Sequence, residues 1–151
     1  MTLYLVQHGD ALDKAQDPGR PLSQRGVSDT RRIGTVAAGY GVRPAQILHS
    51  GKTRARQTAA ILAELLQPPG GVQASPGLGP RDEVSALVHR LDELADAMIV
   101  GHLPFLARLA SLLVAGDADC PVFAFQNGGI VCLCRDGSGW VIRWALMPQV
   151  G

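Results

Sequence analysis

The chain has almost no net charge. Its 151 residues include 14 lysines and arginines against 13 acids, which gives a formal net charge of +1. Such a balance gives no reason to expect a polyanion as the main partner, and we therefore predict no binding to nucleic acid. Any positive field should be local, where a few basic side chains converge.

Cysteine is also scarce, with only Cys120, Cys132 and Cys134 in the sequence. An odd number of cysteines without an export signal favours reduced, buried thiols in a cytoplasmic protein. Cys132 and Cys134 lie two residues apart in a predicted strand, so their side chains should point to one face. This pair provides too few ligands for a metal ion, and we expect neither a metal nor another cofactor.

Long apolar runs are missing. No stretch approaches the length that a membrane span needs, and the N-terminal residues lack the basic segment and apolar core of a signal peptide. The sequence therefore predicts a cytoplasmic protein with no membrane partner. We expect one domain over residues 1–151, large enough to bury about two-thirds of its unfolded surface.

Short apolar runs alternate with amphipathic segments, which predicts an α/β fold built from βαβ units around a mainly parallel sheet. The sequence Asp136-Gly137-Ser138-Gly139 predicts a hairpin and therefore an antiparallel edge. Ser23 is a suitable N-cap. Strands are expected at 3–7, 45–49, 97–101, 129–135 and 139–146, with a weaker one near 72–75, and helices at 23–39, 53–67, 82–94 and 104–115.

The first predicted strand ends abruptly at His8-Gly9. Ligands of open α/β sheets bind beyond the carboxyl ends of parallel strands, and Gly9 permits a backbone turn that other residues resist. A histidine in this position is a candidate nucleophile or general base. A histidine that merely ends a strand is the alternative.

Two further apolar runs end in the same way, because Arg54 follows the second and His102 follows the third. Three strand ends that each supply a basic or imidazole side chain predict a pocket for an anion. Arg54 also begins a predicted helix, where free N–H groups and the helix dipole favour an anion. Four other arginines are expected to be solvated surface charges: Arg31, Arg32, Arg43 and Arg56.

Taken together, these segments resemble the histidine phosphatase superfamily, whose members are similar to phosphoglycerate mutase, and among them the small SixA-type phosphohistidine phosphatases. The resemblance covers nearly the whole chain. It rests on four segments in order: His8-Gly9-Asp10-Ala11, Arg20-Pro21-Leu22-Ser23, Ser50 to Thr58 with Arg54-Ala55 and Gln57-Thr58, and His102-Leu103-Pro104. It implies a three-layer α/β/α fold with a central, mostly parallel mixed sheet.

The resemblance also implies roles for these residues. His8 would be the nucleophile, with its second ring nitrogen fixed by an acceptor such as a backbone carbonyl. Arg54 would clamp the phosphoryl oxygens, and His102 would contact the same group. Arg20 would lie near the mouth of the pocket. The implied substrate is a phosphorylated protein, a histidine-containing phosphocarrier, and the product is inorganic phosphate.

The sequence departs from the family where Gln7 replaces the arginine that normally precedes the histidine. An amide can donate N–H to a phosphoryl oxygen but brings no charge. The replacement should weaken stabilisation about 5- to 30-fold, since a charge-assisted hydrogen bond is stronger by roughly 1–2 kcal/mol. Gln7 thus remains a candidate phosphate-binding residue in an enzyme of reduced activity.

The second departure is the lack of a clear acidic proton donor. Asp82 and Glu83 are candidates, although acids in a first helical turn are common without any catalytic role. Phosphorylated imidazole is a good leaving group that needs little acid help, which favours phosphohistidine as the substrate. Two alternatives stay open: a small-molecule phosphomonoesterase that uses one of these acids, and a non-catalytic phosphate-binding pseudophosphatase.

Overall fold

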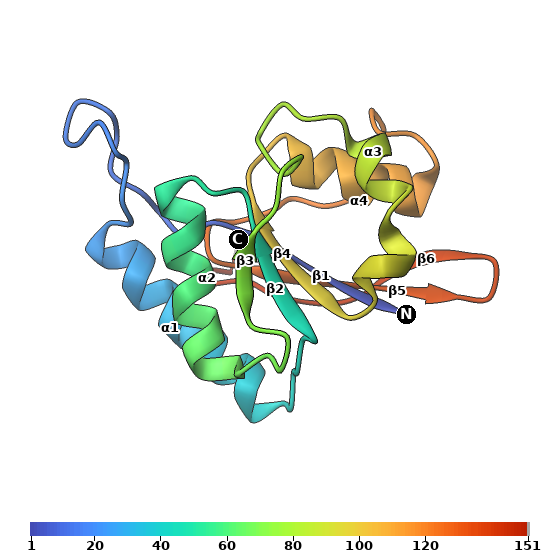
Figure 1. The fold of residues 1–151 in the computed structure, drawn as a ribbon, viewed down its shortest axis with the longest axis horizontal. Helices are drawn as coiled ribbons and strands as arrows, with labels where there is room; N and C mark the ends of the chain where they lie inside the picture. Colours follow the sequence, from blue (N-terminus) through green and yellow to red (C-terminus); the bar gives the residue numbers. More distant parts are fainter. Residues whose placement is uncertain (151) are drawn as a thin grey trace.

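The computed structural model describes residues 1–150, which form a six-stranded sheet between two layers of helices (Figure 1). The predicted three-layer α/β/α architecture is confirmed. In chain order the elements are β1 (Thr2–Gln7), α1 (Gln24–Gly39), β2 (Gln46–His49), α2 (Thr53–Leu66), β3 (Val72–Ala74), α3 (Val84–Val88), the 3-10 helix η1 (Leu91–Leu94), β4 (Ala97–Gly101), α4 (Phe105–Ala115), β5 (Ile130–Asp136) and β6 (Gly139–Leu146).

The sheet has the strand order β3-β2-β4-β1-β5-β6. The first four of these strands run parallel, and β4 is buried along its whole length, as expected for a strand covered on both faces. Gln7 pairs with Gly101, and His49 pairs with Val100. The carboxyl ends of β1, β4 and β2 therefore lie side by side at one edge of the sheet.

The antiparallel edge is also confirmed. β5 pairs with β1 and with β6, and the hairpin between Asp136 and Gly139 turns at Gly137, whose φ is +59°. A positive φ at this place is what a two-residue hairpin loop requires, and glycine adopts it without strain. The sheet is consequently mixed, with its parallel half carrying the strand ends that matter for the site.

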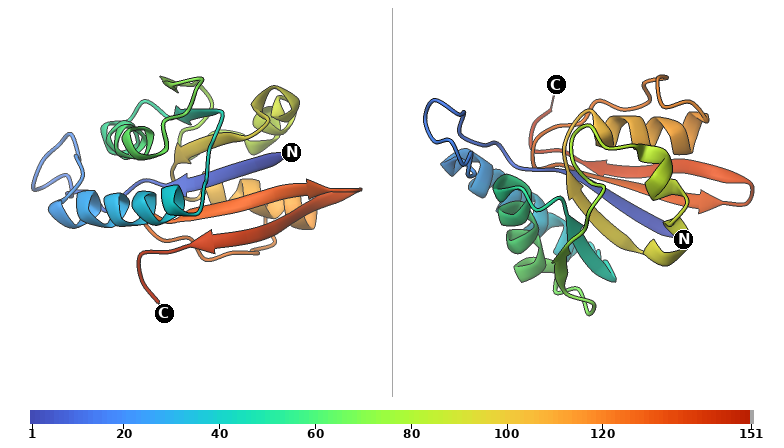
Figure 2. Two further views of the ribbon diagram at one scale, coloured as in Figure 1. Left: turned by 90° about the horizontal axis from the view of Figure 1, so that it is seen from below. Right: turned by 45° about the horizontal axis from the view of Figure 1, so that its top comes forward.

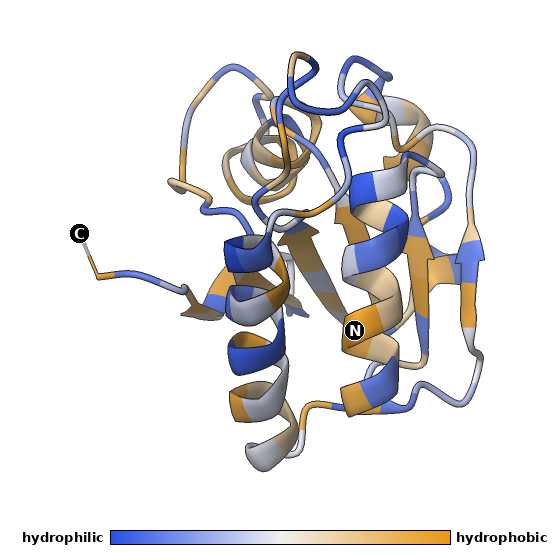
Figure 3. Ribbon diagram, turned by 90° about the vertical axis from the view of Figure 1, so that its left-hand side faces the viewer, coloured by the Kyte–Doolittle hydropathy of each residue, from blue (hydrophilic) through white to orange (hydrophobic). Residues whose placement is uncertain are grey.

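Each face of the sheet has its own apolar core. On one face α1 and α2 bury Ile33, Ala59 and Leu62 against Val6, and on the other face Phe105 and other residues of α3, η1 and α4 pack onto the sheet. Figure 2 shows the two helical layers on opposite sides of the strands. In Figure 3 the strands are largely hydrophobic, whereas hydrophilic residues lie on the outer side of the nearest helices. These layers hold the strand ends in fixed positions.

Two helix ends have clear local causes, the first of which was predicted. Ser23 caps α1, because its hydroxyl accepts a hydrogen bond from the backbone N–H of Gly26 at 3.0 Å. Helix α2 ends at Leu66, where Gln67 adopts a left-handed conformation with φ +47° immediately before Pro68. Within residues 1–150, none of the helices is both long enough and apolar enough to cross a membrane.

Two expectations about the elements and the thiols were wrong. The helix predicted over 82–94 is divided into α3 and η1, because the N–H groups of Arg90 and Glu93 bond three residues back in tight turns. The thiols were expected to be buried, but only Cys132 is, while Cys134 is partly exposed and Cys120 lies on the surface. All three are free thiols, and burial raises the pKa of Cys132 to about 11.

Candidate active site

His8 directly follows β1, and its backbone N–H bonds to the carbonyl of Gly101 at the end of β4, at 3.0 Å. Its ring is half-buried, and Nδ1 lies 2.7 Å from the carbonyl oxygen of Gly9. A carbonyl only accepts, so Nδ1 carries the proton and Nε2 keeps an unshared electron pair. This is the tautomer that a nucleophilic imidazole needs.

Arg54, the second residue of α2, lies against that nitrogen. Its Nε donates to Nε2 of His8 at 3.3 Å. A guanidinium group has no acceptor, so this contact independently requires an unprotonated Nε2. The structure thus brings together the first two residues that the sequence placed at an anion pocket.

His102 is the third. It follows β4, is 2% exposed, and its ring centroid lies 5.1 Å from that of His8. Nε2 of His102 is 2.6 Å from Oγ of Ser50, and Oγ also accepts the N–H of Lys52 at 3.3 Å. The serine hydroxyl can donate to Nε2 or accept from it, because a neutral imidazole nitrogen serves either role, whereas Nδ1 of His102 makes no such contact. Among residues 1–150 that Nδ1 has no hydrogen-bond partner.

Burial and neighbouring cations keep both imidazoles neutral. Burial lowers the pKa of His8, and the charges of Arg54 and Arg20 lower it further, although the hydrogen bond to Gly9 opposes them. Burial is also the main cause that lowers the pKa of His102 to about 3, with His8 and Arg54 the largest further contributors. The positive charge of the site accordingly belongs to guanidinium groups, while the imidazoles offer lone pairs and N–H donors.

Arg20 lies near the pocket, as the resemblance implied. Its charge lowers the pKa of His8, of Arg54 and of His102. The residue has a positive φ of +47°, and its Nε donates to the carbonyl of Leu12 at 3.1 Å. Since a left-handed conformation is costly for arginine, the surrounding loop must hold this side chain in place.

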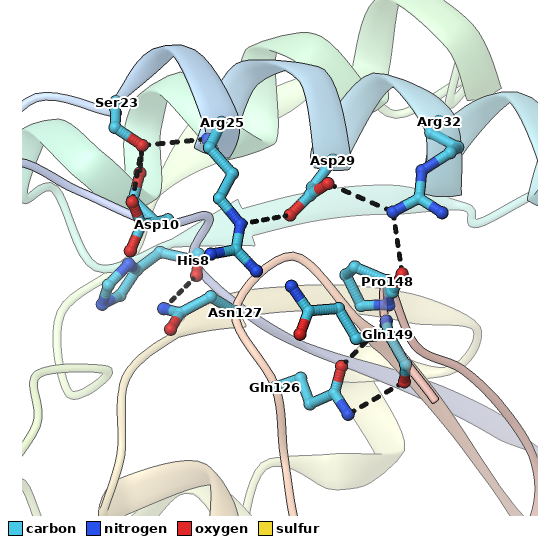
Figure 4. Close-up of polar contacts among 11 residues, drawn as sticks. His8, Asp10, Ser23, Arg25, Asp29, Arg32, Gln126, Asn127, Pro148 and Gln149 are labelled. Carbon is cyan, nitrogen blue, oxygen red and sulfur yellow. Dashed lines mark hydrogen bonds and ion pairs between the residues drawn. The ribbon is translucent and has the colours of Figure 1, made fainter. Parts of the chain in front are cut away.

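Three supporting residues were not predicted. Thr58 accepts the N–H of Gly9 at 2.9 Å and donates to the carbonyl of Arg54 at 2.8 Å, which ties the loop after β1 to α2. Gln57 accepts the N–H of Leu22 at 2.7 Å. Asn127 donates to the carbonyl of His8 at 2.9 Å (Figure 4). Gln57 and Thr58 stand in the segment that carried the resemblance, whereas Asn127 follows no local signal because its contact depends on tertiary structure.

Gly9 is needed for a reason other than the expected one. Its φ is not positive, but a Cβ at this position would lie 2.8 Å from Oγ1 of Thr30 and 3.0 Å from the carbonyl oxygen of Gly26. A Cβ on Gly26 would in turn clash with the carbonyl oxygen of Asp10. These glycines allow α1 to approach the His8 loop closely.

Gln7 ends β1 and is half-buried. Its Oε1 is buried and finds no hydrogen-bond donor within residues 1–150. A buried acceptor without a partner is unfavourable by about 1–3 kcal/mol. The oxygen of this side chain is therefore not held by a hydrogen bond to the described residues.

Asp82 and Glu83 do not form the start of a helix as expected, because α3 begins only at Val84. Both are exposed, and Oδ2 of Asp82 accepts the N–H of Gly79 at 2.7 Å. Within the described residues no hydrogen bond or ion pair joins either carboxylate to His8 or His102. The observed role of Asp82 is to hold its own loop.

Four other arginines and two other histidines make no hydrogen bond to His8 or His102 within residues 1–150. Arg31, Arg32, Arg43 and Arg56 are exposed, as predicted. His49 is buried, and its Nδ1 accepts the N–H of Gly51 at 3.1 Å, so it shapes the turn after β2. His89 is exposed at the end of α3. Groups of three or more histidines, cysteines or acids that could bind a metal do not occur in residues 1–150.

The fold and this arrangement of two histidines and an arginine define a class of protein. The family model of the histidine phosphatase superfamily (branch 1) matches residues 3–82, and the chain belongs to this superfamily.

Among curated relatives, the phosphohistidine phosphatase SixA of Escherichia coli (strain K12) is 29% identical, and the match covers 98% of this chain and 94% of SixA. A solved structure of the protein histidine phosphatase SixA complexed with tungstate superimposes with a TM-score of 0.85 at 28% identity, covering 98% of this chain and 97% of that one. The alpha-ribazole phosphatase of Shigella flexneri has a TM-score of 0.76 at 19% identity, over 100% and 98% of the two chains, and so shares the fold.

Proposed function

We propose that this protein is a phosphohistidine phosphatase that removes phosphate from a phosphorylated histidine of a carrier protein in the cytoplasm. One observation carries the proposal: Nδ1 of His8 is bonded to the Gly9 carbonyl, and Nε2 is left as a lone pair beside Arg54 at 3.3 Å. The proposal places the whole activity in one domain over residues 1–151, of which Gly151 lies outside the described residues.

In the first step, Nε2 of His8 attacks the phosphorus atom of the substrate. A new P–N bond forms on His8 while the P–N bond to the substrate imidazole breaks, and its electron pair stays on that imidazole, which takes a proton from water. In the second step, water attacks the phosphoryl group on His8. Inorganic phosphate leaves, and Nε2 regains its lone pair. Splitting the reaction in this way replaces one difficult displacement with two easier ones.

The other residues of the site stabilise the transferred group. Arg54 and Arg20 offer guanidinium donors to the phosphoryl oxygens, and this electrostatic contribution is the largest that a preformed site makes. Neutral His102 contributes an N–H donor. Gln7 contributes at most an uncharged amide donor, so the proposed enzyme is slower than relatives with arginine at this position.

The choice of substrate rests on the leaving group. Neither Asp82 nor Glu83 bonds to the site, and Asp82 already accepts a hydrogen bond from Gly79. Imidazole leaves without strong acid help, whereas an alkoxide needs it. The name of the similar SixA phosphatase from Escherichia coli agrees with this choice.

The direct test is incubation with a phosphorylated histidine-containing carrier protein, with release of inorganic phosphate as the measurement. We expect release that continues in the presence of a chelator and stops in the His8→Ala variant. Faster release from simple aryl or sugar phosphates would instead establish a small-molecule phosphomonoesterase. Binding of the phosphorylated carrier without any release would establish a non-catalytic phosphate-binding protein.

A further inference from the structure

Next to the reacting imidazole lies a cavity of about 360 Å³ whose charged lining is entirely basic. It is bounded by the loop after β1 and by the start of α2. Its lining residues are Lys14, Pro18, Gly19, Arg20, Lys52, Thr53, Arg54 and Pro80. Four of these eight residues carry positive charge.

The four cations form no direct pair with the acids of the same loop; Asp13 and Asp17 instead accept the backbone N–H groups of Gln16 and Gly19. None of them takes part in an ion pair within residues 1–150. A second groove beside His8 is different, because its Arg25 pairs with Asp29 at 3.6 Å and Asp10 lies on the same wall (Figure 4). The cations of the basic cavity are therefore available to a ligand. In the neighbouring groove, by contrast, Arg25 is already paired with an acid of the protein.

One phosphoryl group does not account for all four cations. Arg54 and Arg20 suffice to face a phosphoryl dianion at His8, and both act electrostatically on that imidazole. Lys52 also acts on His102, whereas Lys14 is not among the charges that shift the pKa of either imidazole. Four unpaired cations close together repel one another, and a second anion would relieve that repulsion.

The position of Lys14 indicates what carries the second anion. The loop of residues 11–20 projects from the body of the molecule near the start of α2 (Figures 1 and 2). A lysine on a projecting loop can contact the surface of a large substrate around its phosphorylated side chain. Lysine is a mobile point charge that suits scattered carboxylates, whereas planar recognition of phosphate favours arginine.

We infer that Lys14 and Lys52 form a second anion subsite that binds acidic side chains flanking the phosphohistidine of the protein substrate. This inference rests on the proposed function and extends it to the choice of partner. Charge pairs at such a rim mainly set specificity and association rate, so the preference should be strong at low salt and fade as salt screens it.

The test uses two synthetic peptides with the same phosphohistidine, one flanked by glutamates and one by glutamines. Affinity is measured with the His8→Ala chain, which cannot turn the peptides over. We expect about 5- to 30-fold tighter binding of the glutamate peptide at low salt, the range for one or two charge contacts. Lys14→Gln combined with Lys52→Gln should reduce this ratio to within about twofold, whereas the exposed control Arg43→Gln should retain it.

Equal affinity for the two peptides, failure to bind either, or a ratio that survives in the double lysine variant would overturn the inference. Faster turnover of a bisphosphorylated sugar than of the glutamate peptide, lost in the same double variant, would assign the subsite to a second phosphate and overturn it too. Phosphate release by the wild-type chain reports separately on the proposed function. A preserved glutamate preference without release would refute only the hydrolysis.

Discussion

Two groups of arginines in this protein have different surroundings. Arg31, Arg32, Arg108 and Arg135 lie on the outer surface, and each pairs with an acid: Glu64, Asp29, Asp119 and Asp92 respectively. Arg20 and Arg54 lie at the strand ends and belong to no ion pair within residues 1–150. Their nearest polar partners are instead a backbone carbonyl and an imidazole nitrogen.

The difference shows how the same side chain serves stability or function. Exposed ion pairs contribute little, about 0–1 kcal/mol each, and can be lost without consequence. At the strand ends, burial and mutual repulsion lower the pKa of Arg54. Cations kept close together without counter-charges are poised for an anionic ligand.

Removal of His8 should have the largest effect, and it tests whether this residue is the nucleophile of the strand-end site. His8→Ala should lower phosphate release by about 10⁴-fold or more, as removal of a covalent nucleophile does in other enzymes. The thermal unfolding midpoint should change little, because the ring is half-buried outside both apolar cores. Turnover near the wild-type value would exclude covalent catalysis through His8.

The next effect contrasts the two groups of arginines directly. Arg54→Ala should reduce kcat/KM about 10²- to 10³-fold, the usual result of removing a donor to developing negative charge. Arg56→Ala, two residues along the same helix but exposed, should change it less than about twofold. Arg54→Lys should recover only part of the loss, since an ammonium group lacks the guanidinium fork. Equal losses for Arg54→Ala and Arg56→Ala would refute the assignment of Arg54.

A smaller effect should come from adding a cation to the strand-end group. Gln7→Arg should raise kcat about 5- to 30-fold, because a charge-assisted hydrogen bond replaces a neutral one. The buried Oε1 of Gln7 has no partner within residues 1–150, so the substitution removes no observed hydrogen bond there. An unchanged or lower rate would mean that Arg20 already supplies this charge and that the amide is a fitted part of the site.

A further effect concerns stability and not turnover. Because the pKa of His102 is about 3 in the folded chain and 6.5 in the unfolded chain, only the unfolded chain gains this proton as the pH falls between those values. The free energy of unfolding should fall over that range, by at most about 1.4 kcal/mol per pH unit for one proton. Urea unfolding of His102→Asn at several pH values should show a shallower decline, whereas the exposed control His89→Asn should not. An identical slope for both variants would contradict the burial argument.

Much of the fold could be predicted because its signals are local. Continuous apolar runs marked β1 and β4, and the predicted hairpin begins and ends at the observed residues, Asp136 and Gly139. The division of the helix at 82–94 could not be predicted, since Leu87, Leu91 and Leu94 maintain an apolar stripe through the break. The break itself lies in the backbone hydrogen bonds of Arg90 and Glu93, which reach three residues back.

The candidate site could likewise be predicted only in part. His8, Arg54 and His102 each follow a strand, and parallel strands bring their carboxyl ends to one edge of the sheet. The hydrogen bonds of Asn127 to His8 and of Ser50 to His102 span 119 and 52 residues, and neither pairing has a local signal. The free charge of Lys14 and Lys52 likewise depends on which acids lie nearby in space, which spacing along the chain does not reveal.

Trapping the covalent intermediate tests the central claim most directly. The wild-type chain is mixed with a carrier protein that bears isotopically labelled phosphohistidine, quenched rapidly in alkali, digested and analysed by mass spectrometry. We expect label on His8 that appears before free phosphate, and none in the His8→Ala variant. Phosphate release without label on His8, or label on His102 instead, would contradict it.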